Sequence, residues 1–133
     1  MNKRREFLGH GIGMLGLLAG ASGPARANLQ SAEIVVIGGG YGGATAAKYL
    51  RLFSNNTARV TLIEPNASFI SCPLSNLVVG GSKNLAELTI SYANLSKRHG
   101  IKMIQDSALQ IDPETKRIKL VSGQIVQIGR AHV

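Results

Sequence analysis

Residues 33–43 have the sequence Glu-Ile-Val-Val-Ile-Gly-Gly-Gly-Tyr-Gly-Gly, a short β-branched run followed by a cluster of glycines. Glu33 to Ile37 carries apolar side chains on both faces, as expected for a parallel strand that is covered on both sides. Ala44 to Phe53 contains good helix formers, and the polar residues 54–56 end that helix. Arg59 to Ile63 is a second β-branched run. The order of strand, turn, helix and strand predicts a parallel pair with a right-handed crossover.

The glycines fit the pattern G-x-G-x-x-G, which binds dinucleotides where a strand turns into a helix. Gly38 allows the tight turn, Gly40 lets the backbone approach a pyrophosphate, and Gly43 permits close packing of the helix on the strand. Gly39 and Gly42 complete the predicted binding segment. The helix then directs its free N–H groups and its positive dipole end toward the pyrophosphate.

Glu64 follows the second strand, 21 residues after Gly43. A carboxylate at this distance can accept hydrogen bonds from a ribose. Taken alone, Glu64 is equally compatible with a solvated residue at a strand end. Together with the glycines and the strand pattern, it predicts a dinucleotide site in an α/β Rossmann-like domain.

The rest of the chain predicts further elements of the same domain. Pro65 to Ser75 is expected to be a loop, and Ser91 to be the N-cap of a helix that runs to His99. Gly100 follows as the residue that ends this helix, and Ile101 to Gln105 is the third parallel strand. An antiparallel meander is expected from three short runs, Ala108 to Ile111, Arg117 to Val121 and Gln124 to Ile128.

Composition excludes several classes of protein. Basic residues outnumber acidic ones 15 to 7, but the surplus is scattered and aromatic residues are only 5% of the chain, which argues against a nucleic-acid surface. With 44% hydrophobic residues and a mean hydropathy of +0.11 the chain is too apolar to be disordered. A single cysteine excludes a disulfide scaffold and a multi-thiolate metal site.

Residues 1–27 have the layout of a removable export signal. Arg4 and Arg5 precede an apolar, glycine-rich stretch at residues 9–21, and Ala25-Arg26-Ala27 provides small residues for a signal peptidase. The apolar stretch is too short for a membrane-spanning helix. The paired arginines resemble the twin-arginine signal of proteins exported already folded, with an ordinary secretory signal as the alternative. We therefore expect a periplasmic protein that begins at Asn28.

The last six residues, 128–133, break off after a strand-like run and look like a translated sequencing adapter; an irregular loop is the alternative. We therefore expect residues 28–127 to be the N-terminal part of a longer domain that is incomplete at its C-terminus.

Two features suggest which dinucleotide is bound. Ala47 lies four residues after Gly43 and Leu50 three after that, which resembles the extended glycine fingerprint of FAD-binding two-dinucleotide flavoproteins. The predicted meander is also similar to that superfamily, whereas simple NAD domains usually continue with another helix. The resemblance implies FAD, with NAD as the alternative.

From residue 33 to about residue 127 the chain resembles the flavoprotein subunit of flavocytochrome c sulfide dehydrogenase. The resemblance is carried by three blocks: Ile37–Leu50, Val60–Asn66 and Ser71–Gly81. The first block is common among flavoproteins, whereas the Cys-Pro-Leu-Ser-Asn of the third is much more particular to this family.

The resemblance implies that FAD is attached covalently through Cys72 and that Ala108 lies near the adenine. Cys72 follows Glu64 by eight residues, which reach roughly 26 to 29 Å when extended, enough to run from the ribose toward the flavin. Without the resemblance, a lone cysteine is better interpreted as a buried, inert thiol. The implied cofactor-binding residues are Gly38, Gly39, Gly40, Gly42, Gly43, Glu64, Pro65, Cys72 and Ala108.

The implied reaction is oxidation of sulfide to sulfur or polysulfide, with electrons passing through FAD to a c-type cytochrome. The redox-active cysteine pair of the family would follow residue 133, so we expect no catalytic residue in this segment and little activity from it alone. One alternative is a quinone-linked sulfide oxidoreductase or another disulfide-reductase-like flavoenzyme. A flavin-binding assembly protein without catalytic thiols is the non-enzyme alternative.

Overall fold

Three parallel strands form the central sheet of the computed structural model, which describes residues 32–129. They are β1 (Glu33–Ile37), β2 (Arg59–Ile63) and β5 (Lys102–Ile104), in the order β1-β2-β5. Val35 pairs with Thr61, and Ile63 pairs with Ile104. All three predicted parallel strands are confirmed.

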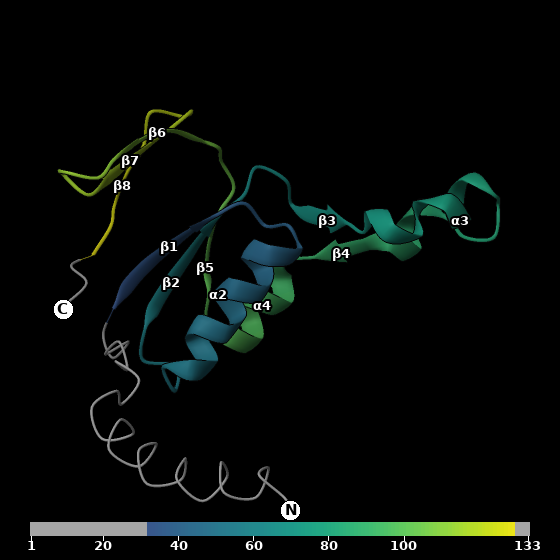
Figure 1. Cartoon of the computed structure of the whole chain (residues 1–133), viewed down its shortest axis with the longest axis horizontal. Helices are drawn as coiled ribbons and strands as arrows, with labels where there is room; N and C mark the ends of the chain where they lie inside the picture. The colour runs from purple at the N-terminus through teal and green to yellow at the C-terminus, as the bar shows by residue number, and fades with distance from the viewer. Residues whose placement is uncertain (1–31, 130–133) are drawn as a thin grey trace, which may run out of the picture.

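Two helices, α2 (Tyr41–Phe53) and α4 (Ala93–His99), cover one face of this sheet (Figure 1). Between them and the sheet lies a core of buried apolar residues: Ala47, Ala58, Val60, Leu62 and Ile101. Successive side chains of a strand point to opposite faces of the sheet. Accordingly, Ile34 and Val36 of β1 pack on this core, whereas Val35 packs on the other face. The strand is thus covered on both sides, as its sequence predicts.

An antiparallel meander packs on the other face. It consists of β6 (Ala108–Asp112), β7 (Arg117–Leu120) and β8 (Ile125–Gln127), in that order. Ile118 and Leu120 of β7 are fully buried against Ile63 of the parallel sheet. The prediction of an α/β domain with a parallel sheet, crossover helices and a meander is therefore confirmed.

Residues 68–91 form an arm that projects from the sheet (Figure 1). Its base is a two-stranded ladder, in which Phe69 pairs with Ile90. The arm contains β3 (Ser68–Ile70), a 3₁₀ turn (Cys72–Leu74), α3 (Ser75–Val79), a second 3₁₀ turn (Leu85–Leu88) and β4 (Thr89–Ser91). The prediction of a plain loop from Pro65 to Ser75 is wrong for most of its length, because β3 is defined by pairing with a strand some twenty residues away.

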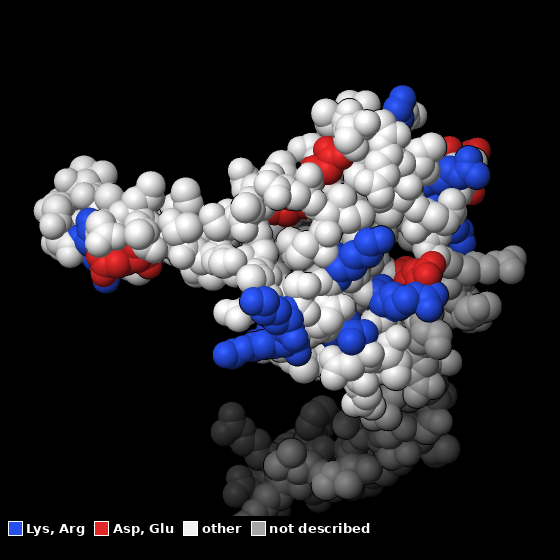
Figure 2. Space-filling model, turned by 180° about the vertical axis from the view of Figure 1, so that it is seen from behind, with Lys and Arg blue, Asp and Glu red and all other residues white. Residues whose placement is uncertain are grey.

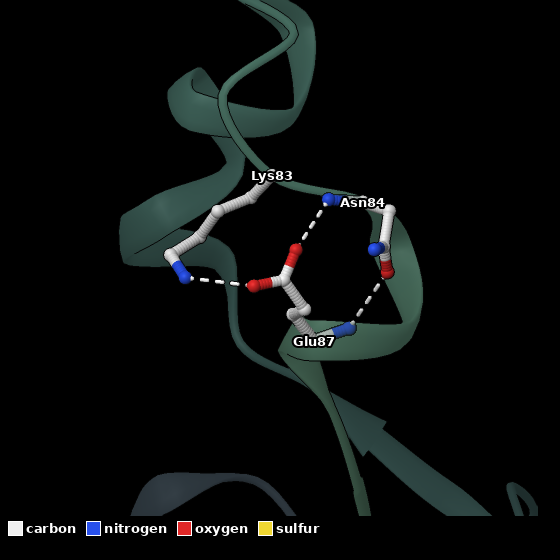
Figure 3. Close-up of polar contacts among 3 residues, drawn as sticks. All are labelled: Lys83, Asn84 and Glu87. Atoms are coloured by element: carbon white, nitrogen blue, oxygen red, sulfur yellow. Dashed lines mark hydrogen bonds and ion pairs between the residues drawn. The ribbon is translucent and has the colours of Figure 1, made fainter.

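The outer part of the arm is held by a capping box (Figure 3). The Asn84 side chain accepts a hydrogen bond from the Glu87 N–H (3.1 Å), and the Glu87 carboxylate accepts from the Asn84 N–H (2.9 Å). Lys83 donates to the other oxygen of the same carboxylate at 3.0 Å. Lys83 and Glu87 are the only charged residues of the arm, and Figure 2 shows this pair from behind.

Both helix starts differ from the prediction. α2 begins at Tyr41, inside the glycine cluster, and α4 begins at Ala93 with Tyr92 as its N-cap. Ser91 belongs to β4, and its Oγ accepts a hydrogen bond from the Ala93 N–H at 3.1 Å. Ser91 therefore stabilises the helix entry from one residue farther out. The predicted end of α4 is confirmed, since Gly100 has a φ of +62°.

The predicted export signal, residues 1–27, lies outside the described residues, as do residues 130–133 of the predicted tail. Among the helices of residues 32–129, none combines the length and the apolar character needed to cross a membrane.

Gly43 and Gly42 offer a direct test of this packing. A Cβ at Gly43 would overlap the Gly38 carbonyl oxygen, whereas a Cβ at Gly42 would meet no atom within 4 Å. We expect Gly43→Ala to destabilise the full-length protein by about 3 kcal/mol or more, as overpacking against rigid backbone does. Gly42→Ala should be neutral or slightly stabilising. Urea denaturation measures both, and equal effects of the two substitutions would contradict the packing.

Candidate functional site

The glycine turn joins the carboxyl end of β1 to the first turn of α2. Gly38 has a φ of +91°, which a side chain would disfavour, and its N–H donates to the Ile63 carbonyl at 2.9 Å. The first intrahelical bond runs from the Ala44 N–H to the Gly40 carbonyl. The N–H groups of Tyr41, Gly42 and Gly43 therefore have no intrahelical acceptor, and they cluster at the positive end of the helix dipole.

The glycine turn is open at Gly40 and closed at Gly43. A Cβ at Gly40 would meet no atom within 4 Å, so the backbone there is open to a ligand. Gly43 has the opposite surroundings, because it packs against Gly38 and Val36. The turn is thus closed toward the protein and open at Gly40, which agrees with the roles expected for these two glycines.

Glu64 lies immediately after β2 and contacts the turn directly. Its Oε2 accepts a hydrogen bond from the Gly39 N–H at 2.7 Å, and its Oε1 accepts from the Asn66 backbone N–H (3.0 Å) and side-chain amide (2.7 Å). The side chain is buried, with 8% of the residue exposed. Burial alone would raise the pKa of Glu64, but the hydrogen bonds from Gly39 and Asn66 together lower it below its ordinary value. Glu64 is therefore ionised at neutral pH.

A cavity of about 220 Å³ lies beside Glu64, at the carboxyl ends of β2 and β5. Open α/β sheets bind ligands at this end. Pro65 is exposed between Glu64 and Asn66. The cavity is lined by Glu64, Asn66, Ala67, Ser91, Tyr92, Ala93, Met103 and Gln105.

A larger cavity of about 440 Å³ opens between the parallel sheet and the meander. Its lining includes Glu33 and Arg59, the first residues of β1 and β2, which form a salt bridge with an N–O hydrogen bond of 2.8 Å. This cavity therefore lies at the amino ends of the strands, away from the glycine turn, and is not the candidate nucleotide site.

Tyr92 is a residue of the site that the sequence did not indicate. Its hydroxyl donates to the Gly39 carbonyl at 2.9 Å, and only 7% of the residue is exposed. Burial raises the pKa of Tyr92, and the nearby negative charge of Glu64 raises it further. The hydroxyl therefore keeps its proton at neutral pH. Sequence reasoning missed this residue because 53 positions separate Tyr92 from Gly39.

Cys72 is exposed at the start of the first 3₁₀ turn of the arm, not buried. The preceding residue, Ser71, shares a hydrogen bond with the Tyr41 hydroxyl at the start of α2. The Tyr41 ring also packs edge-to-face on Phe69, with 4.7 Å between ring centroids. These two contacts of Tyr41 connect the segment that precedes Cys72 to the first turn of α2.

Ala108 lies in the meander. It begins β6, pairs with Leu120 and packs beside the buried cluster that includes Ile118. A position near an adenine remains a prediction for Ala108. Among residues 32–129, no group of three or more His, Cys, Asp or Glu side chains is arranged to hold a metal ion.

Sequence comparison supports a redox flavoprotein. The sequence model of the pyridine nucleotide-disulphide oxidoreductase family matches residues 32–131. Over 46 residues the chain is 53% identical to the sulfide dehydrogenase (flavocytochrome c) flavoprotein chain of Chlorobaculum thiosulfatiphilum, a match that covers 35% of this chain and 94% of that sequence. The resemblance inferred from the three sequence blocks is thereby confirmed.

More distant relatives are longer. The chain is 29% identical over 95 residues to the sulfide-quinone reductase of Aquifex aeolicus, which covers 71% of this chain and 22% of the relative. The X-ray structure of the sulfide:quinone oxidoreductase from Aquifex aeolicus superposes with a TM-score of 0.67 at 28% identity, over 73% of this chain and 22% of that one. The chain thus spans about a fifth of these two relatives.

The hydrogen bonds of Glu64 predict a pH dependence of stability. The folded pKa lies below the ordinary value of 4.5, so ionised Glu64 stabilises the fold above about pH 4.5, and this contribution is lost as the pH falls through the folded pKa. We expect Glu64→Gln to lower the free energy of unfolding at pH 7, on the order of 1 kcal/mol or more. The variant should also lose less stability than the wild type when the pH is lowered.

Urea unfolding of the full-length protein between pH 7 and pH 3 measures both effects. Glu114→Gln, at an exposed turn residue, corrects for the change in net charge. A Glu64→Gln variant that is as acid-sensitive as the wild type would contradict the assigned role of the carboxylate.

Proposed function

The chain belongs to the pyridine nucleotide-disulphide oxidoreductase family, and on this basis we propose that it carries the FAD-binding turn of a flavoprotein that oxidises sulfide. The observation that carries the proposal is the glycine turn, which is open at Gly40 and bonded through Gly39 to a buried carboxylate. The similarity to a sulfide dehydrogenase flavoprotein and to a sulfide-quinone reductase supports sulfide as the substrate.

Residues of the turn would bind the phosphates of FAD. The N–H groups of Tyr41, Gly42 and Gly43 offer hydrogen bonds and partial positive charge to a pyrophosphate. Ionised Glu64 can only accept hydrogen bonds, which suits it to the hydroxyl groups of a ribose. The cavity beside Glu64 is lined without any Lys or Arg, so we assign the recognition of negative charge to backbone amides.

When bound, FAD would take the two electrons released as HS⁻ becomes sulfur and a proton, and pass them on singly to a haem. The described residues would bind and orient the cofactor. We assign no catalytic residue among them, and we propose that the thiols which react with sulfide belong to another part of the protein.

We also propose that Cys72 holds FAD covalently. The proposal rests on the resemblance of the Cys72 segment, on the exposure of its thiol and on the Tyr41–Ser71 hydrogen bond, which fastens the segment to the first turn of α2. The thioether would replace the S–H bond of Cys72 and one C–H bond of the flavin's ring methyl group, and the oxidised flavin itself would take up the two electrons. This bond would keep the cofactor in place during export and alter its reduction potential.

As electron acceptor we propose a c-type cytochrome subunit, because the relative with 53% identity is named as a flavocytochrome c chain. A quinone is the second candidate, favoured by the 29% identity to a sulfide-quinone reductase. We further propose that the protein is periplasmic, on the strength of the paired residues Arg4 and Arg5 in the predicted signal.

The proposed activity can be tested with purified full-length protein. We expect it to be yellow, to bleach when sulfide is added under anaerobic conditions, and to regain its colour with oxidised cytochrome c but not with a soluble quinone. Gly40→Ala is the control, because it adds a methyl group only to the open side of the turn. This variant should remain folded and lose FAD. Recovery with quinone alone would favour the quinone-linked alternative, and a colourless wild type would refute the proposed function.

Covalent attachment predicts a mass adduct of one FAD that survives acid precipitation and maps to the peptide containing Cys72. In Cys72→Ser the adduct should be absent, while FAD remains bound without a covalent bond, because the glycine turn is unchanged. Mass spectrometry of both proteins measures this. Complete release of flavin from the wild type, or an adduct that persists in Cys72→Ser, would disprove the attachment.

A further inference from the structure

Gly39 occupies a position at which the fingerprint of the turn does not require glycine. Within the turn only Gly38 has a positive φ, and Gly43 provides the close packing of helix and strand. A Cβ at Gly39 would nevertheless lie 2.5 Å from Tyr92 Oη and 2.9 Å from Glu64 Cγ. The absence of a side chain at residue 39 is therefore explained by the close approach of Tyr92 and Glu64.

Both polar backbone groups of Gly39 are bonded to these two side chains. The N–H donates to Glu64 Oε2 at 2.7 Å, and the carbonyl accepts from the Tyr92 hydroxyl at 2.9 Å. Both hydrogen bonds are buried. The orientation of the Gly39 backbone is thus set by side chains that come from two other parts of the fold.

The hydrogen bond from Tyr92 also sets the orientation of the next N–H group. The peptide between Gly39 and Gly40 is planar and trans, so its carbonyl and the Gly40 N–H point in opposite directions. Because the carbonyl is directed at Tyr92, the Gly40 N–H is directed away from it. A Cβ built at Gly40 would meet no atom within 4 Å, so this side of the turn is open.

We propose that Tyr92 is a positioning residue for pyrophosphate recognition: its hydroxyl holds the Gly39–Gly40 peptide so that the Gly40 N–H faces the phosphates. The inference rests on the proposed function, because it deepens the role of the same turn. Packing alone does not account for the hydroxyl, since phenylalanine would fill the same space. Without the hydroxyl, the buried Gly39 carbonyl would lose the partner that fixes its direction.

The test uses Tyr92→Phe, which keeps the ring and removes the donor. All proteins are full-length and carry Cys72→Ser, so that FAD can be washed out before calorimetric titration with ADP and with adenosine. We expect Tyr92→Phe to weaken ADP binding about tenfold, as the loss of one well-placed hydrogen bond does. Binding of adenosine, which has no phosphates, should be unchanged. Tyr49→Phe, at a residue of α2 that is 43% exposed, should bind both ligands like the parent.

The outcomes separate this inference from the proposed function. A parent protein that binds neither FAD nor ADP refutes the proposed function. If the parent binds ADP and Tyr92→Phe binds it equally well, or loses ADP and adenosine to the same extent, positioning by the hydroxyl is refuted. If Tyr92→Phe does not fold, 3-fluorotyrosine at residue 92 gives the answer, because it keeps the shape and donates more strongly. The preference for ADP over adenosine should then increase, and an unchanged preference would refute the inference.

Discussion

The close approach of α2 to β1 at Gly43 is the constraint on which this domain depends. Gly43 packs against the Gly38 carbonyl, so the helix can start directly above the end of the strand. This approach lets Ala47 pack at zero exposure in the core, beside Val60 and Leu62 of β2. It also leaves the first N–H groups of α2 at the carboxyl end of the sheet, where Glu64 lies. The same packing therefore produces both the core and the geometry of the candidate site.

Electrostatics explains why a buried carboxylate is tolerated at this place. Removing Glu64 from water disfavours its charge, but three N–H donors from Gly39 and Asn66 offset this cost. The hydroxyl of Tyr92 donates a hydrogen bond to the Gly39 carbonyl and stays neutral, so it adds no charge near Glu64. The charge of Glu64 is thus stabilised by oriented N–H groups, and by our proposal the phosphates are bound in the same way by the N–H groups of Gly40 and of the first turn of α2.

The local parts of this fold could be predicted from sequence, whereas the parts made by distant contacts could not. The unit from Glu33 to Ile63 follows from strand pattern and glycine spacing, both of which act over a few residues. The arm could not be predicted, because Phe69 becomes part of a strand only by pairing with Ile90. Glu64 was predictable from its spacing to the glycines. Tyr92 was not, because nothing in its neighbouring sequence indicates a bond to Gly39.

Two hydrogen bonds connect the glycine turn to the arm and to Tyr92, the residue that directly follows the arm. On the outgoing side Ser71 bonds to Tyr41, and on the returning side Tyr92 bonds to Gly39. Cys72 follows the first of these anchors directly. A displacement of the turn would therefore be transmitted to both strands of the arm. Since the turn is also where we propose the pyrophosphate to bind, occupation of the nucleotide site should stabilise the base of the arm and so restrict where the Cys72 thiol can lie. We therefore expect the proposed attachment at Cys72 to follow binding of the nucleotide at the glycine turn.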